Sequence, residues 1–114
     1  TAWIRIQDEF SAGIVDWSGF EDYRACSWQR QLHLYEVPFY YIEYGIAQLG
    51  AIAMWKQYRE NKEQALDHYM QALSLGSTKP LKALYEAAGI RFDFSPDYVK
   101  ELTNFVQEEL AQLL

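Results

Sequence analysis

Helix start and stop signals recur along this 114-residue chain, whereas signals for β-strands are almost absent. Asn61, followed three residues later by Gln64, has the pattern of a capping box, which satisfies backbone N–H groups at the start of a helix. Ser95-Pro96 has the pattern of an N-cap followed by a proline at the first helical position. Gly76 has the position of a glycine that ends a helix. The sequence therefore predicts an all-α fold of five or six helices.

These signals and the spacing of the apolar residues give approximate bounds for the helices. The expected segments are 3–13, 20–34, 38–60, 62–75, 80–88 and a last helix that begins at Pro96. In the second segment, the candidates for burial are Tyr23, Trp28 and Leu32. In the last helix, the apolar stripe comprises Tyr98, Leu102, Phe105, Val106, Leu110 and Leu113. We expect 91–94 to be an extended link, with a short strand as the alternative.

Composition and charge exclude several classes of protein. Half of the residues are hydrophobic and 17% are aromatic, so the chain is not a disordered segment. Its length suits a single helical domain, which we expect to span 1–114. The net charge of -6 argues against nucleic acid as a partner, because phosphate binding needs clustered lysine and arginine. The longest apolar stretch, 45–55, has about half the length of a membrane span, so no membrane partner is expected.

The single cysteine, Cys26, permits no internal disulfide. We expect it to be buried and unreactive, in a protein located in the reducing cytoplasm. No secretory signal peptide is recognisable. The chain opens on Thr1 without an initiator methionine, which suggests a fragment of a longer protein, or a processed or trimmed chain.

The segment from His33 to Tyr44 is rich in polar aromatic side chains where an ordinary core helix would carry leucine and alanine. If a helix begins at Pro38, the three tyrosines that follow it lie within an arc of about 100° on its surface. These are Tyr40, Tyr41 and Tyr44. A tyrosine hydroxyl keeps its proton near neutral pH and can donate a hydrogen bond to a peptide carbonyl or to a developing oxyanion. The simpler interpretation is that the three rings belong to the hydrophobic core.

We expect no metal site within this chain, because a hydrolytic site needs three or four converging His, Cys, Asp or Glu ligands. The chain has two histidines, and neither belongs to a His-Glu-x-x-His pair. His33 and Glu36 have a spacing that would let them share a metal ion on a helix, but this spacing is common by chance. No complete set of catalytic residues is recognisable.

Gly45 and Gly50 lie inside the helix expected over 38–60, where glycine is about 1 kcal/mol less favourable than alanine. They indicate close contact with another element, either an active-site helix or a helix of this same domain. The segment 63–75 resembles the second helix of a tetratricopeptide repeat. The repeat period of about 34 residues is not visible elsewhere in the chain.

Three stretches resemble the C-terminal part of oligoendopeptidase F, a family of cytosolic zinc peptidases related to thimet oligopeptidase. The stretches are Val15-Asp16-Trp17-Ser18-Gly19, Trp28-Gln29-Arg30-Gln31-Leu32-His33 and Pro38-Phe39-Tyr40-Tyr41-Ile42-Glu43-Tyr44-Gly45-Ile46-Ala47-Gln48. The resemblance continues to the C-terminus and covers essentially the whole chain. It implies the C-terminal helical part of a zincin-type oligopeptidase, within a larger catalytic domain.

The resemblance also implies a catalytic apparatus. A His-Glu-x-x-His helix and a downstream glutamate bind zinc in the parent enzyme, and both would lie upstream of Thr1, so this chain would bind no zinc. A histidine and two tyrosines three residues apart face the substrate and stabilise the tetrahedral intermediate. His33 matches that histidine, and Tyr41 and Tyr44 match the tyrosines. The loop between them is about one residue shorter than in the thimet branch, so Tyr40 competes with Tyr41 for this role.

We therefore interpret the chain as the C-terminal segment of a zinc-dependent oligoendopeptidase that hydrolyses short peptides. The expected catalytic residues are His33, Tyr41 and Tyr44, and the expected substrate-binding residues are Tyr40 and Tyr35. The expected partners are a short peptide and the missing N-terminal part of the peptidase, with a homodimer through exposed apolar surface as a further option. The chain alone is expected to be inactive. The alternative is a non-enzymatic, tetratricopeptide-like interaction module, in which the tyrosines pack into a core or a partner's groove.

Overall fold

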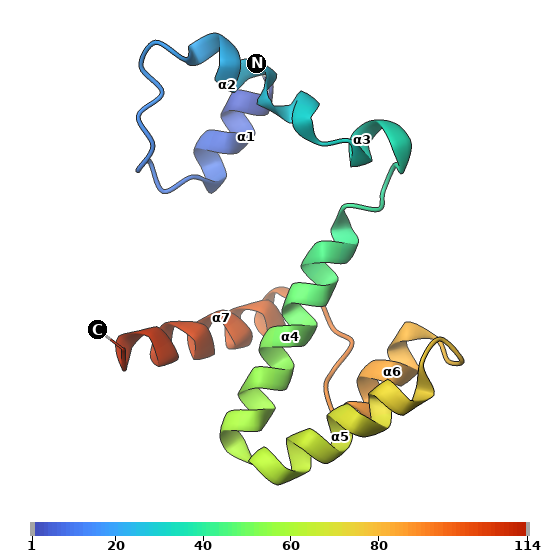
Figure 1. Ribbon diagram of the computed structural model, residues 1–114. Helices are drawn as coiled ribbons and strands as arrows, with labels where there is room; N and C mark the ends of the chain where they lie inside the picture. The colour runs from blue at the N-terminus through green and yellow to red at the C-terminus, as the bar shows by residue number, and fades with distance from the viewer. Residues whose placement is uncertain (1, 114) are drawn as a thin grey trace. The chain divides into compact units, whose positions relative to one another are not determined.

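The computed structural model describes residues 2–113, which form helices joined by loops (Figure 1). Over this range there are seven α-helices, one 3₁₀ helix and no β-strand, so the all-α prediction is confirmed and the alternative of a strand at 91–94 is wrong. In chain order the elements are α1 (Ala2–Phe10), α2 (Glu21–Cys26), the 3₁₀ helix η1 (Ser27–Arg30), α3 (His33–Glu36), α4 (Ile42–Glu60), α5 (Lys62–Leu75), α6 (Leu81–Ala87) and α7 (Pro96–Ala111). None of these helices combines the length and the apolar character needed to cross a lipid bilayer.

The chain divides into two compact units, and the division falls between Tyr41 and Ile42. The first unit contains α1, α2, η1 and α3, and the second contains α4 to α7. Each unit has its own internal packing. The expectation of a single domain over 1–114 stays a prediction.

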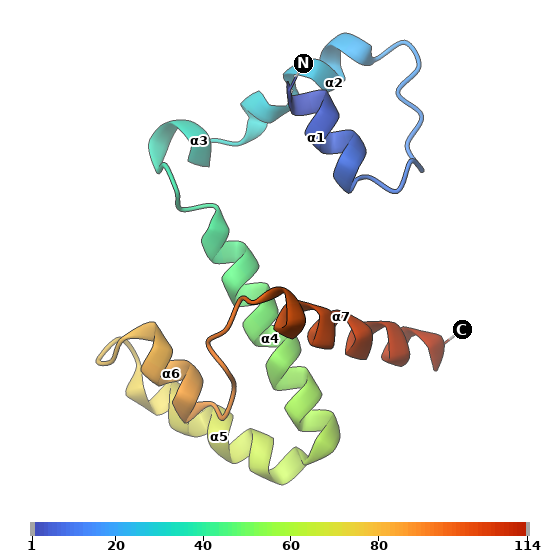
Figure 2. The ribbon, with the colours of Figure 1, turned by 180° about the vertical axis from the view of Figure 1, so that it is seen from behind.

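The second unit is built around α4, which packs against both α5 and α7, while α5 also packs against α6. The two opposite views of the ribbon show α5 and α6 side by side and α7 crossing α4 (Figure 1 and Figure 2). In the core, Ala53 of α4 packs with Tyr98 and Leu102 of α7, and Leu102 is only 1% exposed. Burial of such a leucine contributes roughly 1.5–3 kcal/mol. The predicted apolar stripe of α7 is thus buried at its N-terminal end, while Leu110 is 52% exposed.

Local capping interactions set the helix ends in this unit. The side-chain oxygen of Asn61 accepts a hydrogen bond from the N–H of Gln64 at 3.2 Å. The Oγ of Ser95 accepts one from the N–H of Tyr98 at 3.3 Å. Gly76 ends α5 with a left-handed φ of 52°. The predictions for α5 and for the start of α7 are confirmed, and α6 is one residue shorter at each end than predicted.

The first unit differs more from the prediction, because the helix expected over 20–34 is broken into α2, η1 and α3. The hydroxyl of Ser27 donates to the carbonyl of Arg24 at 2.8 Å and accepts from the indole Nε1 of Trp3 at 2.8 Å. Hydroxyl–backbone bonds of this kind compete with the helical hydrogen-bond ladder. The hydroxyl therefore ties α1 to the end of α2 at the point where the α-helix gives way to η1.

Several side chains of the first unit are more exposed than expected. Tyr23 is 74% and Leu32 is 60% exposed, so the prediction that they are buried is wrong, whereas Trp28 is half-buried. Cys26 is exposed, so its predicted burial is also wrong. A unit of about 40 residues is too small to enclose many large side chains, because so much of its volume lies at the surface.

The start of α4 also differs from the prediction, because the helix begins at Ile42, four residues after Pro38. The intervening residues form a turn in which the N–H of Tyr40 donates to the carbonyl of Val37 at 3.1 Å. Phe39 has a φ of 67°, which lies in the left-handed region. A residue in this conformation cannot continue a right-handed helix, so α4 starts only after it.

Gly50 lets the Tyr85 side chain of α6 reach the backbone of α4. The hydroxyl of Tyr85 donates a hydrogen bond to the carbonyl of Ile46 at 2.9 Å, and a Cβ added at Gly50 would lie 2.5 Å from that hydroxyl oxygen. A Cβ added at Gly45, by contrast, would have no described atom within 4 Å. Contact within this chain therefore explains Gly50, and it does not explain Gly45.

His68 connects α5 to α4. Its Nδ1 lies 3.1 Å from the Nε2 of Gln57 on α4, and that same Nε2 donates to the carbonyl of Gly89 at 3.3 Å. His68 is half-buried at this junction. Its environment is entirely within the second unit.

We predict opposite effects for the same substitution at the two glycines of α4. Gly50→Ala should lower the free energy of unfolding by about 1–2 kcal/mol, because the clash with Tyr85 outweighs the gain in helix propensity. Gly45→Ala should raise it by up to about 1 kcal/mol, because only the propensity gain applies. Urea unfolding followed by helical circular dichroism measures both values. Equal effects of the two substitutions would contradict the prediction.

We also predict that stability falls at alkaline pH through Tyr85. Burial raises the pKa of the Tyr85 hydroxyl, and the nearby Tyr98 adds to the effect. The stabilising contribution is fully present below the unfolded-state pKa of about 10 and is lost as the pH rises through the folded-state value, because the unfolded chain loses this proton first. Tyr85→Phe should make the decline in unfolding free energy above that pH shallower than in the wild type. If the unfolding free energy declines equally steeply in the wild type and in Tyr85→Phe, Tyr85 is not the cause of the alkaline destabilisation.

Candidate substrate-binding site

His33 is the first residue of α3, a single helical turn in the first unit. The N–H of Val37 donates to the carbonyl of His33 at 3.3 Å and ends this turn. The side chain of His33 is half-buried. One short turn thus places the imidazole immediately before the bend at Phe39.

Two consecutive tyrosines pack against the imidazole of His33. The ring of Tyr40 is parallel to the imidazole, with 2° between the planes and 6.0 Å between the centroids. The ring of Tyr41 meets the imidazole edge-on, at 64° and 5.2 Å. Aromatic pairs in such arrangements contribute about 0.5–1.5 kcal/mol beyond their buried area. We call these three residues the His33 cluster.

The two tyrosines of the His33 cluster are partly accessible to solvent. Tyr40 is 44% exposed and Tyr41 is 51% exposed. The tyrosine rings therefore hold the imidazole and still present surface to a ligand. An imidazole and two phenol groups can donate hydrogen bonds to carbonyl oxygens.

Phe39 is the residue of this region that sequence reasoning missed. Its left-handed φ of 67° costs a non-glycine residue about 1–2 kcal/mol. Its side chain is 96% exposed. The sequence carried no signal for it, because an aromatic residue is rarely found at positive φ.

Tyr35 packs in a different direction from the His33 cluster. Its ring stacks on Trp28 of η1, with 6.1 Å between the centroids and 27° between the planes. Residues two apart on a helix do not face each other, which separates Tyr35 from His33 although both belong to α3. Tyr35 is 57% exposed.

Tyr44 belongs to the second unit, where it lies in the first turn of α4 and is 54% exposed. The prediction that Tyr40, Tyr41 and Tyr44 share one helical face is wrong, because only Tyr44 lies within the helix. The left-handed turn at Phe39 ends the regular spacing on which that prediction depended.

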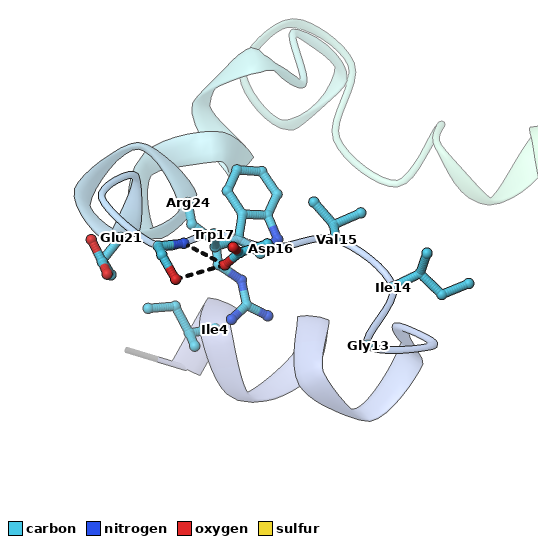
Figure 3. A pocket seen from close by; sticks show the side chains of 9 residues that line it. Ile4, Gly13, Ile14, Val15, Asp16, Trp17, Glu21 and Arg24 are labelled. Atoms are coloured by element: carbon cyan, nitrogen blue, oxygen red, sulfur yellow. Dashed lines mark hydrogen bonds between the residues drawn. The ribbon is translucent and has the colours of Figure 1, made fainter.

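A separate hollow of about 560 Å³ lies in the first unit, lined in part by Ile4, Trp17 and Arg24 (Figure 3). The guanidinium carbon of Arg24 lies 5.9 Å from the centroid of the Trp17 ring. The same guanidinium forms an ion pair with Asp8 of α1. The cation of this hollow is therefore already paired within the chain.

The loop that borders this hollow begins earlier than predicted, because α1 ends at Phe10 instead of near Gly13. Gly13 has a left-handed φ of 66°, and Ile14 after it is 87% exposed. Further along the loop, the hydroxyl and the N–H of Ser18 donate to the carboxylate of Asp16 at 2.6 Å and 2.9 Å (Figure 3). These hydrogen bonds lower the pKa of Asp16 below its ordinary value. The Asp16 carboxylate thus supports the loop.

Within the described part of the chain, no group of three or more His, Cys, Asp or Glu side chains could hold a metal ion. His33 and Glu36 both lie in α3. Among the described residues, no third His, Cys, Asp or Glu side chain joins them to form a metal-binding group.

Fold and geometry together define an all-helical segment that presents a histidine packed between aromatic rings. The family model described as Peptidase family M3 matches residues 2–104, so it covers most of the chain. The chain belongs to peptidase family M3, and the resemblance to thimet-oligopeptidase-like peptidases is confirmed at the level of the family. No individual curated protein and no solved structure matches the chain closely enough to count as a relative.

Proposed function

We propose that this chain supplies the substrate-binding wall of an oligoendopeptidase F-like peptidase of family M3, which hydrolyses short peptides. In this proposal His33, Tyr41 and Tyr44 are catalytic, and Tyr40 and Tyr35 bind the substrate. The observation that carries it is the His33 cluster, an imidazole packed by two half-exposed tyrosines. Membership of family M3 makes a peptide the natural ligand for such a cluster.

The chemistry of the proposal is hydrogen bonding to oxygen. When water attacks a peptide carbonyl, negative charge develops on the carbonyl oxygen, and donors already in position stabilise that charge. In this proposal the phenol groups of Tyr41 and Tyr44 and the imidazole of His33 act as such donors. Stacking on Tyr40 holds the plane of the imidazole at 2° to the phenol ring, which limits the directions in which its nitrogens point.

In this proposal the zinc ion is bound by other residues of the parent enzyme. Peptidases of family M3 are generally zinc-dependent. The side chains described for this chain do not form a ligand set for zinc. We therefore place the metal ligands outside 1–114, and the role proposed for this chain involves no step at the metal.

The exposure of the tyrosines removes one of the two forms of the interaction-module alternative. That alternative expects the rings in a hydrophobic core or in a partner's groove. Tyr40, Tyr41 and Tyr44 are each about half exposed, so they do not form a core of this chain. A partner's groove is then the one remaining place for them in the alternative.

We further propose that the remainder of the peptidase covers apolar surface that is exposed on this chain, and that the isolated chain forms a homodimer instead. Phe10, Ile14 and Leu113 are all more than 80% exposed. Large exposed apolar side chains favour association. A cytoplasmic location fits the single cysteine of the chain.

Removal of single hydroxyls in the complete peptidase tests the catalytic assignment. Tyr41→Phe and Tyr44→Phe should each lower kcat on the order of 10²–10³-fold with little change in KM, because an oxyanion donor acts mainly in the transition state. Tyr23→Phe is the matched control, since Tyr23 is an exposed tyrosine outside the proposed site. Wild-type kcat in both test variants would sink the assignment.

The isolated chain supplies a second test. With zinc added, the purified 114-residue chain should not hydrolyse short peptides, because its described residues provide no set of metal ligands. A fluorogenic peptide assay, with the complete peptidase as positive control, measures this. Peptide hydrolysis that persists after further purification and requires His33 would show that the chain is catalytic by itself.

A further inference from the structure

We propose that Phe39 is a positioning residue for the His33 cluster, and that it acts through its left-handed backbone and not through its ring. The inference rests on the proposed function for its relevance to peptide hydrolysis. Its geometric basis lies entirely within the first unit. It assigns a role to a residue that makes none of the ring contacts to His33 itself.

Tyr40 and Tyr41 are neighbours in the chain, yet both rings pack on the same imidazole. Neighbouring residues point about 100° apart on a helix and to opposite faces on a strand. His33 lies earlier in the chain, so the chain has to turn back before Tyr40 for both rings to meet the imidazole.

Phe39 is the residue that makes the bend. The N–H of Tyr40 donates to the carbonyl of Val37 at 3.1 Å, so the chain reverses across Pro38 and Phe39. Pro38 has its φ restricted by its ring to about −65°. Phe39, with its φ of 67°, supplies the change of direction.

The backbone of Phe39 makes the bend, and its side chain does not contribute to it. The Phe39 side chain is 96% exposed, so packing of the ring is not what holds the residue in place. A strained backbone persists only where its surroundings determine it. Here the turn to Val37 and the two ring contacts on His33 lie on either side of Phe39 and provide that constraint.

The consequence for the site is control of the imidazole plane. The Tyr40 ring lies parallel to the imidazole and the Tyr41 ring meets it edge-on. If residue 39 leaves the left-handed region, both tyrosines move together, and the imidazole loses the contacts that fix its orientation. Phe39 therefore acts on His33 through two tyrosines at once.

The test uses the full chain labelled with ¹³C-histidine, in which His33 and His68 are the two labelled residues. Phe39→Gly and Phe39→Asn keep access to positive φ, whereas the β-branched side chain in Phe39→Val strongly disfavours it. We expect the glycine and asparagine variants to keep the ring-current shift of His33 and its NOEs to Tyr40 and Tyr41. The valine variant should lose both.

Two controls make the result decisive. Phe20→Val makes the same change at an exposed phenylalanine whose φ is -126°, so the His33 signals should not move. The His68 signals report on the second unit and should stay constant in every variant. Wild-type His33 signals in Phe39→Val, or lost His33 contacts in Phe39→Gly and Phe39→Asn, would overturn the proposal.

A kinetic measurement distinguishes this inference from the proposed function. In the complete peptidase, Phe39→Val should lower kcat relative to Phe39→Gly with little difference in KM. If the valine variant loses the ring contacts while kcat is unaffected, Phe39 still positions the cluster, and the proposed catalytic role of His33 fails. If both the contacts and kcat fall, the two proposals stand together.

Discussion

A hydrogen bond that only a glycine permits organises the second unit. The hydroxyl of Tyr85 reaches the carbonyl of Ile46 because Gly50 has no side chain in the way. The ring of Tyr85 in turn meets Phe92 edge-on at 5.1 Å, and Phe92 lies in the link between α6 and α7. Tyr85 therefore connects the backbone of α4 with the link between α6 and α7. The Tyr85 side chain fills the space that a Cβ at residue 50 would need, so this contact tolerates little change in volume.

Much of the second unit could be predicted from the sequence, because its helix ends depend on local chemistry. Asn61, Gly76 and Ser95 each act within one turn of their own position, so their roles are readable without knowledge of the fold. The first unit could not be predicted in the same way. The hydroxyl of Ser27 binds both Arg24, one turn away, and Trp3, which is distant in the sequence, at the point where the helical pattern of 20–34 is broken.

The candidate site illustrates the same division between local and tertiary information. Residue types and spacing pointed to His33 and the tyrosines, and the family resemblance gave them roles. The geometry was beyond the sequence, because it depends on a left-handed φ at Phe39, a conformation that aromatic residues rarely adopt. The predicted common face of Tyr40, Tyr41 and Tyr44 was consequently wrong, although His33 does pack against Tyr40 and Tyr41.

The uneven burial of α7 has a consequence for its dynamics. Leu102 is 1% exposed, whereas Leu113 is 81% exposed. Backbone amides in the first half of the helix should exchange with deuterium only when the whole unit opens, and those in the last turns should exchange by fraying. The ion pair between Arg59 and Glu109, at 3.0 Å, links the second half of α7 to α4. Because salt screens such a pair, the boundary between slow and fast exchange should move toward Leu102 as ionic strength rises.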